Sequence, residues 1–157
     1  MAVKHKSEVE HQALPRFMIS APQGHSGKTI VSIGICAALA DRGFAVQPFK
    51  KGPDYIDPSW LSLASDRDCR NLDSFLLSES LLISSFKKAT VDADIAIIEG
   101  SMGLFDSSDP TGKGSSADIA RLFDKHMVVI KSELLRQADG LTLSVLKKLR
   151  CFHWSPL

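Results

Sequence analysis

The sequence predicts an α/β fold with a doubly wound, mainly parallel sheet, on two observations. From Pro15 onward, short apolar segments alternate with longer segments whose apolar residues have helical spacing. The first strand, the first helix and the second strand follow one another within about 35 residues, the length of a βαβ unit. Such a unit implies parallel strands joined by a right-handed crossover. The 157 residues suffice for one domain with a single core.

Each element is predicted from its own pattern. Residues 1–14 are polar and of mixed charge, so we expect a flexible extension before a domain at residues 15–157. Short apolar runs predict strands at Arg16–Ser20, Phe44–Phe49, Asp94–Glu99 and Met127–Ile130. Helical spacing predicts helices at Lys28–Arg42, Ser78–Ala89, Ser115–Asp124 and Ser132–Leu149. The segments 50–73 and 100–114 are predicted to be irregular. A sheet of four strands leaves an exposed edge, so we expect the fold to be incomplete.

Composition and charge exclude several classes of function. The 19 Lys and Arg residues balance 18 Asp and Glu residues, so no global field would attract the chain to nucleic acid or to an anionic membrane. Three widely spaced cysteines form neither a disulfide framework nor a zinc pattern, which favours a reducing, cytoplasmic setting. The sequence has neither a membrane-spanning apolar run nor the apolar core of a signal peptide. Any phosphate recognition must therefore be local.

The clearest chemical signal is a turn of small residues between the first strand and the first helix. The turn is formed by Gly24, His25, Ser26, Gly27, Lys28 and Thr29. The backbone N–H groups of such a turn and of the helix N-terminus bind phosphate. Lys28 would reach the terminal phosphates, and the Thr29 hydroxyl would ligate Mg²⁺. Pro22 stands where the full pattern has glycine. We therefore predict a P-loop NTPase-like site for ATP and Mg²⁺, with a plain strand-to-helix turn as the alternative.

Acidic residues follow two of the predicted strands. Glu99 ends a buried strand, where an open α/β sheet binds its ligands, and is the expected metal ligand; a solvated acid is the alternative. After the second strand, Lys50, Asp54 and Asp57 would lie at the same edge of the sheet. The Gly-Pro-Asp and Asp-Pro sequences of this segment also form turns by themselves. The segment therefore has both a functional and a turn-forming interpretation.

Four sequence blocks carry a resemblance to a known family. The blocks are PFKKGPDYIDP at 48–58, NLD at 71–73, EGSMGLFD at 99–106 and GSSADIA at 114–120. In order and approximate spacing they resemble cobyrinic acid a,c-diamide synthase, over residues 15–124. Cobyric acid synthase and dethiobiotin synthetase share the nucleotide fold of that family but lack these blocks. The expected fold is therefore P-loop NTPase-like and similar to dethiobiotin synthetase.

The resemblance implies an ATP-dependent amidation of the a and c side-chain carboxylates of cobyrinic acid, through an acyl phosphate, in cobalamin biosynthesis. Its nitrogen would come from glutamine or ammonia. The residues expected to be catalytic are Lys28, Lys50, Asp57 and Asp106. The metal ligands expected are Thr29, Asp54 and Glu99. The residues expected to contact the corrinoid are Tyr55, Asp57 and Asp106.

The sequence also departs from the patterns of similar proteins. His25 puts a bulky side chain beside the phosphates, and Ser107 stands where the family usually has glycine. The likeness fades after residue 124. Partition-type ATPases carry an extra lysine in the phosphate turn, and the absence of lysine between Arg16 and Lys28 argues against that class.

The family's ammonia source is a glutaminase domain with a cysteine nucleophile and a histidine base, and this sequence has no counterpart of it. Cys36 lies in a predicted buried helix, Cys69 lacks a nucleophile-elbow sequence, and Cys151 is too close to His153 for a dyad. We therefore expect a truncated synthetase half that uses ammonia, or that works with a glutaminase domain or chain; a homodimer stays open. The alternatives are a nucleotide-binding module or inactive fragment, a small-carboxylate ligase, and amidation of another tetrapyrrole.

Overall fold

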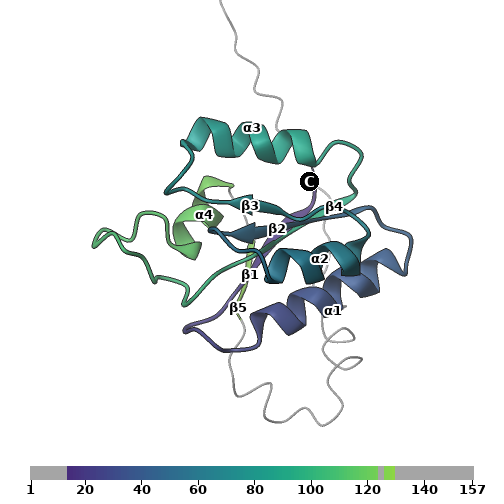
Figure 1. Ribbon diagram of the computed structural model, residues 1–157, viewed down its shortest axis with the longest axis horizontal. Coiled ribbons are helices and arrows are strands. Elements are labelled where there is room, and N and C mark those ends of the chain that lie inside the picture. The colour runs from purple at the N-terminus through teal and green to yellow at the C-terminus, as the bar shows by residue number, and fades with distance from the viewer. Residues whose placement is uncertain (1–13, 124–125, 130–157) are drawn as a thin grey trace, which may run out of the picture.

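A parallel sheet of five strands forms the centre of the fold, in a computed structural model that describes residues 14–123 and 126–129 (Figure 1). In chain order the strands are β1 (Arg16–Ser20), β2 (Val46–Lys51), β3 (Arg70–Leu72), β4 (Ile95–Glu99) and β5 (His126–Val129). Their order across the sheet is β3-β2-β4-β1-β5, and all four neighbouring pairs are parallel. The predicted class of sheet is confirmed.

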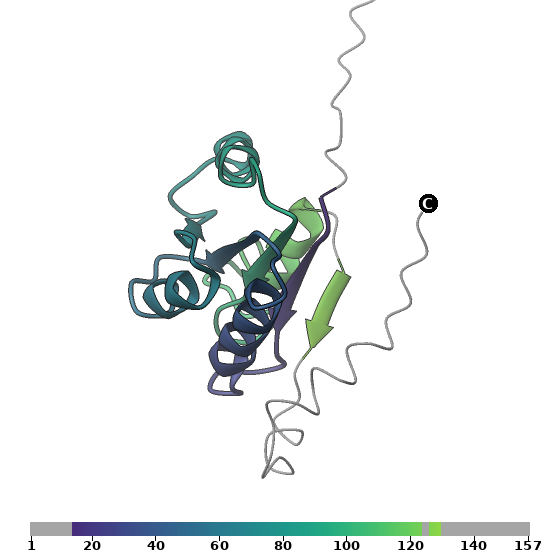
Figure 2. The same cartoon turned by 90° about the vertical axis from the view of Figure 1, so that its right-hand side faces the viewer.

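Helices cover both faces of this sheet. They are α1 (Lys28–Ala40), α2 (Asp57–Ser65), α3 (Glu79–Ala89) and α4 (Ser116–Leu122). Figures 1 and 2 show α1 and α2 on one face and α3 and α4 on the other, which is the doubly wound arrangement. Within the described residues, no helix is long and apolar enough to span a membrane.

Successive side chains along a strand point to opposite faces of the sheet and contribute to two hydrophobic clusters, one on each face. In β1, Met18 packs with α3 and α4, whereas its neighbour Ile19 packs with α1 and α2. The ring of Phe86 in α3 lies 4.7 Å from the rings of both Phe49 and Phe123. Cys36 is fully buried in the other cluster, as predicted. The strands are thus held by apolar packing on both sides, which leaves their carboxyl ends for polar groups.

The prediction that residues 50–73 are irregular is wrong, because this segment contains α2 and β3. The sheet consequently has five strands, not four. Trp60 and Leu63 of α2 are exposed and Leu61 is its one buried apolar residue, so no apolar face marks the helix in the sequence. Strand β3 is only three residues long. The expected helix at Ser132–Leu149, and the extension at residues 1–14 apart from Leu14, lie outside the described residues.

The bounds of β2 and α1 differ from the predicted ones, and the shift of β2 matters for the site. Strand β2 begins and ends two residues later than predicted, so that Lys50 and Lys51 belong to the sheet. Helix α1 ends at Ala40, and Gly43 (φ 85°) follows in the turn that leads back to the sheet. Because Lys50 lies within a paired strand, the sheet itself fixes its backbone opposite Glu99 of β4.

Candidate active site

The candidate site lies at the carboxyl edge of the sheet, where β1, β2 and β4 end side by side. Strand β4 runs between the other two, and Glu99 pairs in register with Ile19 of β1 and with Lys50 of β2. The phosphate turn follows β1, and the loop after β2 leads into α2. Parallel pairing therefore brings together segments that are up to 70 residues apart in the sequence.

The turn before α1 has the features of an anion-binding site. Its backbone takes left-handed conformations at His25 (φ 51°) and Gly27 (φ 80°), and the Ser26 hydroxyl donates to the carbonyl of Gln23 at 3.0 Å. The N-terminus of α1 has no side-chain cap and no acidic residue in its first turn. Its N–H groups and partial positive charge therefore remain for an anionic ligand.

The Lys28 side chain bends back over this turn. Its ammonium donates to the carbonyl of Gln23 at 3.3 Å and to the Ser26 hydroxyl at 3.4 Å, and the side chain is buried. Burial, reinforced by the charge of Lys50, lowers the pKa of the Lys28 ammonium. Lys28 makes no ion pair within the described residues, so an anion in the turn would supply its missing counter-charge.

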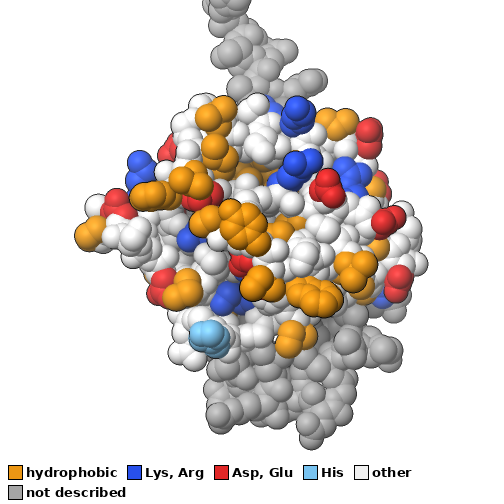
Figure 3. All heavy atoms as spheres, in the orientation of Figure 1, with side chains coloured by type: hydrophobic (Ala, Val, Ile, Leu, Met, Phe, Trp, Pro, Cys, Tyr) orange, Lys and Arg blue, Asp and Glu red, His pale blue; other side chains and the backbone are white. Residues whose placement is uncertain are grey.

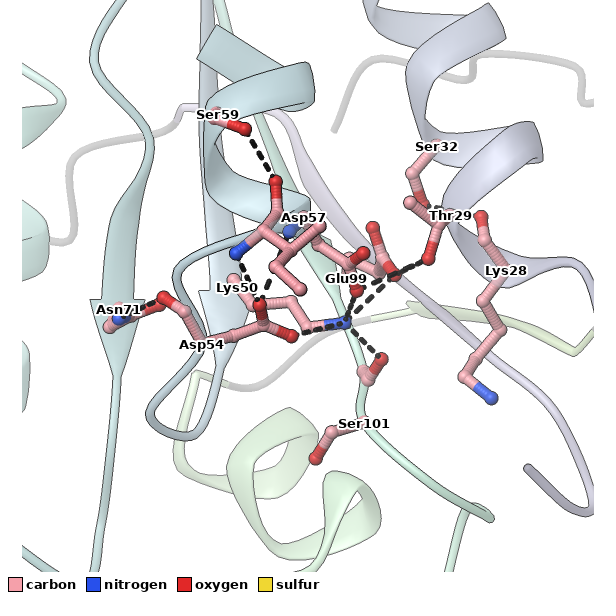
Figure 4. Close-up of polar contacts among 12 residues, drawn as sticks. Lys28, Thr29, Ser32, Lys50, Asp54, Asp57, Ser59, Asn71, Glu99 and Ser101 are labelled. Carbon is pink, nitrogen blue, oxygen red and sulfur yellow. Dashed lines mark hydrogen bonds and ion pairs between the residues drawn. The ribbon is translucent and has the colours of Figure 1, made fainter. Parts of the chain in front are cut away.

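Four side chains form a polar network beside the turn (Figure 4). The Thr29 hydroxyl lies 2.6 Å from Glu99 Oε1 and 3.2 Å from Asp57 Oδ2. The Lys50 ammonium donates to the same two atoms, at 2.6 Å to Asp57 Oδ2 and 2.9 Å to Glu99 Oε1. Figure 4 also shows the Lys28 ammonium pointing away from this network. The site therefore has two separate cationic groups, one at the turn and one between the carboxylates.

Burial has the largest effect on each ionisable group of the network. It acts to lower the pKa of Lys50, but the charge of Glu99 and hydrogen bonds with both carboxylates outweigh it, so that pKa is raised. It acts to raise the pKa of Asp57, but Lys50 and the Thr29 hydroxyl lower that pKa overall. For Glu99, burial prevails and its pKa is raised. Lys50 thus compensates the fully buried charge of Glu99 only in part.

The network fits a magnesium ion that arrives with phosphate. Among the described residues, Glu99 Oε2 is a buried carboxylate oxygen without a hydrogen-bond partner. Two carboxylates and a hydroxyl are hard oxygen donors of the kind that Mg²⁺ prefers. The described part of the chain holds no group of three or more acidic, His or Cys residues that could bind a metal ion by itself. Phosphate and water would therefore have to fill the remaining positions around the ion.

Asp54 and Asp57 lie in different settings, although both follow β2. Asp54 Oδ1 accepts from the backbone N–H groups of Ile56 at 2.9 Å and Asp57 at 3.1 Å, and its Oδ2 is 3.7 Å from the Lys50 ammonium. The Asn71 side chain donates to the Asp54 carbonyl at 2.8 Å. Asp54 thus shapes the turn, whereas Asp57 lies against Thr29; the role of Asp54 as a metal ligand stays a prediction.

The other expected residues surround the network without joining it. The Tyr55 side chain is 87% exposed. Asp106 is exposed, and its Oδ2 accepts from the Gly103 N–H at 2.8 Å. A Cβ added to Gly103 would lie 2.6 Å from the carbonyl oxygen of Pro22, so this loop packs directly on the phosphate turn. Asp106 is held beside the turn in this way.

Sequence reasoning assigned no role to Asn71 or Gly103. Both lie inside the sequence blocks that carry the family resemblance, and their position in these blocks is the signal that could have identified them. Asn71 ties β3 to the turn at Asp54, and Gly103 allows the loop after β4 to approach Pro22. These two residues act on the backbone around the site, which is why their chemistry alone did not single them out.

The fold and this site define a P-loop-type nucleotide-binding domain. A family model described as the CobQ/CobB/MinD/ParA nucleotide binding domain matches residues 17–144. The chain belongs to this family, and the P-loop NTPase-like fold predicted from the sequence is confirmed.

Comparison with individual curated proteins gives a more specific result than the family model. The chain is 50% identical over 117 residues to a cobyrinate a,c-diamide synthase of Magnetococcus marinus, with 74% of this chain and 25% of the relative covered. It is 45% identical over 118 residues to one of Archaeoglobus fulgidus, with 74% and 26% covered. It is 44% identical over 119 residues to a hydrogenobyrinate a,c-diamide synthase of Streptomyces coelicolor, with 75% and 24% covered. The chain therefore spans about a quarter of the length of these relatives, and the resemblance is confirmed.

Proposed function

We propose that this chain carries the ATP-binding part of a synthetase that amidates the a and c side-chain carboxylates of cobyrinic acid, in cobalamin biosynthesis. The observation that carries the proposal is the network of Thr29, Lys50, Asp57 and Glu99 beside an uncapped phosphate turn. The names of the relatives support the reaction and the substrate class. A corrinoid, ATP and glutamine or ammonia are the proposed small-molecule partners.

The proposed chemistry has two steps. A carboxylate oxygen of the substrate attacks the γ-phosphorus of ATP, and ADP leaves to give an acyl phosphate. Ammonia then attacks the acyl carbon, the C–O bond to phosphate breaks, and loss of a proton leaves the amide. Phosphoryl transfer needs mainly positioning and charge neutralisation. The site is suited to both, because it contains the ammonium groups of Lys28 and Lys50 and hard oxygen donors of the kind that Mg²⁺ prefers.

Each residue has a proposed role in this scheme. Lys28 and the turn, residues 24–29, bind the phosphates, and Lys50 neutralises the transferred group. Thr29, Asp57 and Glu99 would hold Mg²⁺, with Asp54 shaping the turn beside them. When bound, Mg²⁺ would neutralise charge on the phosphates. Asp106 is proposed to orient the substrate from the loop beside the turn.

Exposed apolar side chains around the site support a substrate with a large apolar surface. The loops after β2, β3 and β4 each carry two exposed large residues, namely Tyr55 and Ile56, Phe75 and Leu76, and Met102 and Phe105. Figure 3 shows hydrophobic side chains interspersed with charged ones on the face that carries α2. A macrocycle with carboxylate arms would match a polar centre with an apolar surround.

Amidation by the chain itself is tested with ATP, Mg²⁺, ammonium and cobyrinic acid. We expect ADP and the mass change of a carboxylate converted to an amide. A Lys28→Ala variant, which lacks the phosphate-turn ammonium, is the control and should lose both signals. If the wild-type chain gives neither ADP nor an amide, the proposal of catalysis by this chain is wrong. Hydrogenobyrinic acid serves as a second substrate, because one relative carries that name.

A nucleotide-binding module without amidation activity is the second candidate. The observation that favours it is that the phosphate turn and the network suit a phosphate and a metal ion, whereas Tyr55 and Asp106 lie outside the network. A glutaminase domain or chain would then act together with it. Calorimetry with ATP and Mg²⁺ distinguishes the candidates, because binding that is lost in Lys28→Ala, without any amide formed, supports the module.

A further inference from the structure

The Lys50 ammonium occupies the centre of the network. It lies 2.6 Å from Asp57 Oδ2, 2.9 Å from Glu99 Oε1 and 3.5 Å from the carbonyl oxygen of Gly100. Its side chain is 5% exposed. An ammonium has three N–H donors, and these three oxygens can accept all of them. Lys50 is therefore fully engaged inside the site.

Thr29 and Lys50 contact the same two carboxylate oxygens. The Thr29 hydroxyl approaches Glu99 Oε1 and Asp57 Oδ2, and the Lys50 ammonium donates to the same two oxygens. A divalent cation bound by Thr29, Asp57 and Glu99 would need these oxygens as ligands. Because a carboxylate oxygen close to an ammonium is already neutralised, and because like charges repel, the lysine and the cation compete.

We propose that Lys50 is an internal counter-cation: its ammonium neutralises Asp57 and Glu99 when no metal is bound and leaves them when a divalent cation binds. This inference rests on the proposed function only in assigning the metal to these oxygens. The long side chain of lysine can carry the charge from the carboxylates to a nearby phosphate. Metal alone then binds weakly, and metal with nucleotide binds well, because the phosphate gives the ammonium a new partner.

The glutamate supports an exchangeable cation at this position. Glu99 is fully buried, and its Oε2 atom has no hydrogen-bond partner within the described residues. Lys50 engages only Oε1. A buried carboxylate with one free oxygen remains incompletely paired, so a divalent cation would compensate it better than the single charge of the lysine.

The test compares Lys50→Gln with Lys51→Gln, which remove the same charge from adjacent residues of β2. Lys51 makes no hydrogen bond or ion pair with Asp57 or Glu99, so it is the matched control. Mn²⁺ without nucleotide is the probe, and the loss of the free-ion signal in electron paramagnetic resonance reports binding. We expect Lys50→Gln to bind Mn²⁺ on the order of tenfold more tightly than wild type, as removal of one adjacent like charge allows, and Lys51→Gln to match wild type.

Equal Mn²⁺ affinity in the two variants would overturn the proposal, and so would tight binding to the wild-type chain without nucleotide. Lys50→Gln leaves two carboxylates without their cation, so its folding is followed by circular dichroism. If it is unfolded, Mn²⁺ should refold it, and failure to do so would also overturn the proposal. The experiment contains neither corrinoid nor ammonia, so its failure is distinguishable from failure of the amidation assay.

Discussion

Glu99 illustrates how a single side chain can be unfavourable for stability and suited to binding. It is fully buried, and burial raises the pKa of its carboxyl in spite of Lys50. A buried acid of this kind is charged at neutral pH only at a cost to folding. In the proposed function, the cation that Glu99 would hold offsets this cost; perturbed pKa values of this kind are typical of functional sites.

Replacement of this acid by its amide separates the two properties. Glu99→Gln keeps the shape, can still accept from Thr29 and Lys50, and removes a buried charge. Because the raised pKa of Glu99 means that its charge opposes folding at pH 7, and because Lys50 keeps Asp57 as a partner, we expect the free energy of unfolding to stay within about 1 kcal/mol of wild type or to rise. Binding of Mn²⁺ in the presence of ATP should be lost. Urea unfolding and calorimetry measure the two effects, and a large drop in stability would instead show that the Lys50–Glu99 charge pair dominates.

The free energy of unfolding should depend on pH through Asp57, whose pKa is shifted in the opposite direction to that of Glu99. Its pKa is lowered, with the effect of burial outweighed by Lys50 and by the Thr29 hydroxyl. The charged form is thus favoured by folding, so Asp57 contributes stability above the unfolded pKa of about 3.9, which is lost as the pH falls through the lower folded value.

Urea unfolding at a series of acidic pH values tests this contribution. Asp57→Asn should be less stable than wild type at pH 6, and the difference should shrink as the pH falls below about 4. Asp41→Asn is the control, because Asp41 is exposed and its side chain makes no hydrogen bond or ion pair in the described structure. A difference between Asp57→Asn and wild type that stays constant with pH would contradict the assignment.

At the scale of elements, the loop after β4 is fitted to the phosphate turn through its backbone. The Leu104 N–H donates to the carbonyl of Ala21 at 2.7 Å, and Gly103 lies against the carbonyl of Pro22. An added Cβ at Gly103 would be 2.6 Å from that oxygen, closer than real contacts allow. The close packing of the loop after β4 on Ala21 and Pro22, just before the phosphate turn, therefore depends on Gly103.

A pair of glycine substitutions tests this packing. Gly103→Ala should push the loop from the turn, destabilise the protein by about 1–3 kcal/mol and weaken ATP binding. Gly34→Ala, inside α1 with nothing within 4 Å of the added Cβ, should instead stabilise it by about 1 kcal/mol. Thermal unfolding and calorimetry measure both. Equal effects of the two substitutions would show that the contact at Pro22 relaxes without cost.

The elements differ in how well their sequences predict them. β1 was predicted at its observed bounds, because its apolar run is flanked by Pro15 and the turn after Ser20. In α2, exposed Trp60 and Leu63 conceal the helical pattern, and its stability comes instead from packing of Leu61 against the sheet. A short helix or a three-residue strand that is held mainly by tertiary contacts shows little hydrophobic periodicity in its sequence.

The sequence predicts which residues gather at the candidate site, but not which of them contact one another. Parallel strands bring Lys50 and Glu99 to one edge, so the sequence alone could indicate that they gather there. Which aspartate approaches Thr29 depends on the turn after β2, where Asp54 accepts backbone N–H groups and Asp57 begins α2. That choice is set by backbone geometry over three residues, which residue types do not determine.

For the molecule as a whole, the described cysteines are part of the fold and not of the chemistry. Burial raises the pKa of Cys36 and of Cys69 to about 12 in each case. Their thiols are therefore protonated at pH 8 and are poor nucleophiles. We expect iodoacetamide to leave both unmodified in the folded protein and to modify both in urea, as followed by peptide mass spectrometry. Rapid alkylation of Cys69 before unfolding would contradict this.

The strand order has a consequence for how the protein is made. The hydrogen bonds described for the candidate site join residues between Ala21 and Asp106, and β5 is added at the outer edge of β1. Domains can fold while the ribosome is still extending the chain. The candidate site can therefore assemble on the emerging polypeptide once β4 and its loop have left the exit tunnel, while the edge strand is still inside the tunnel.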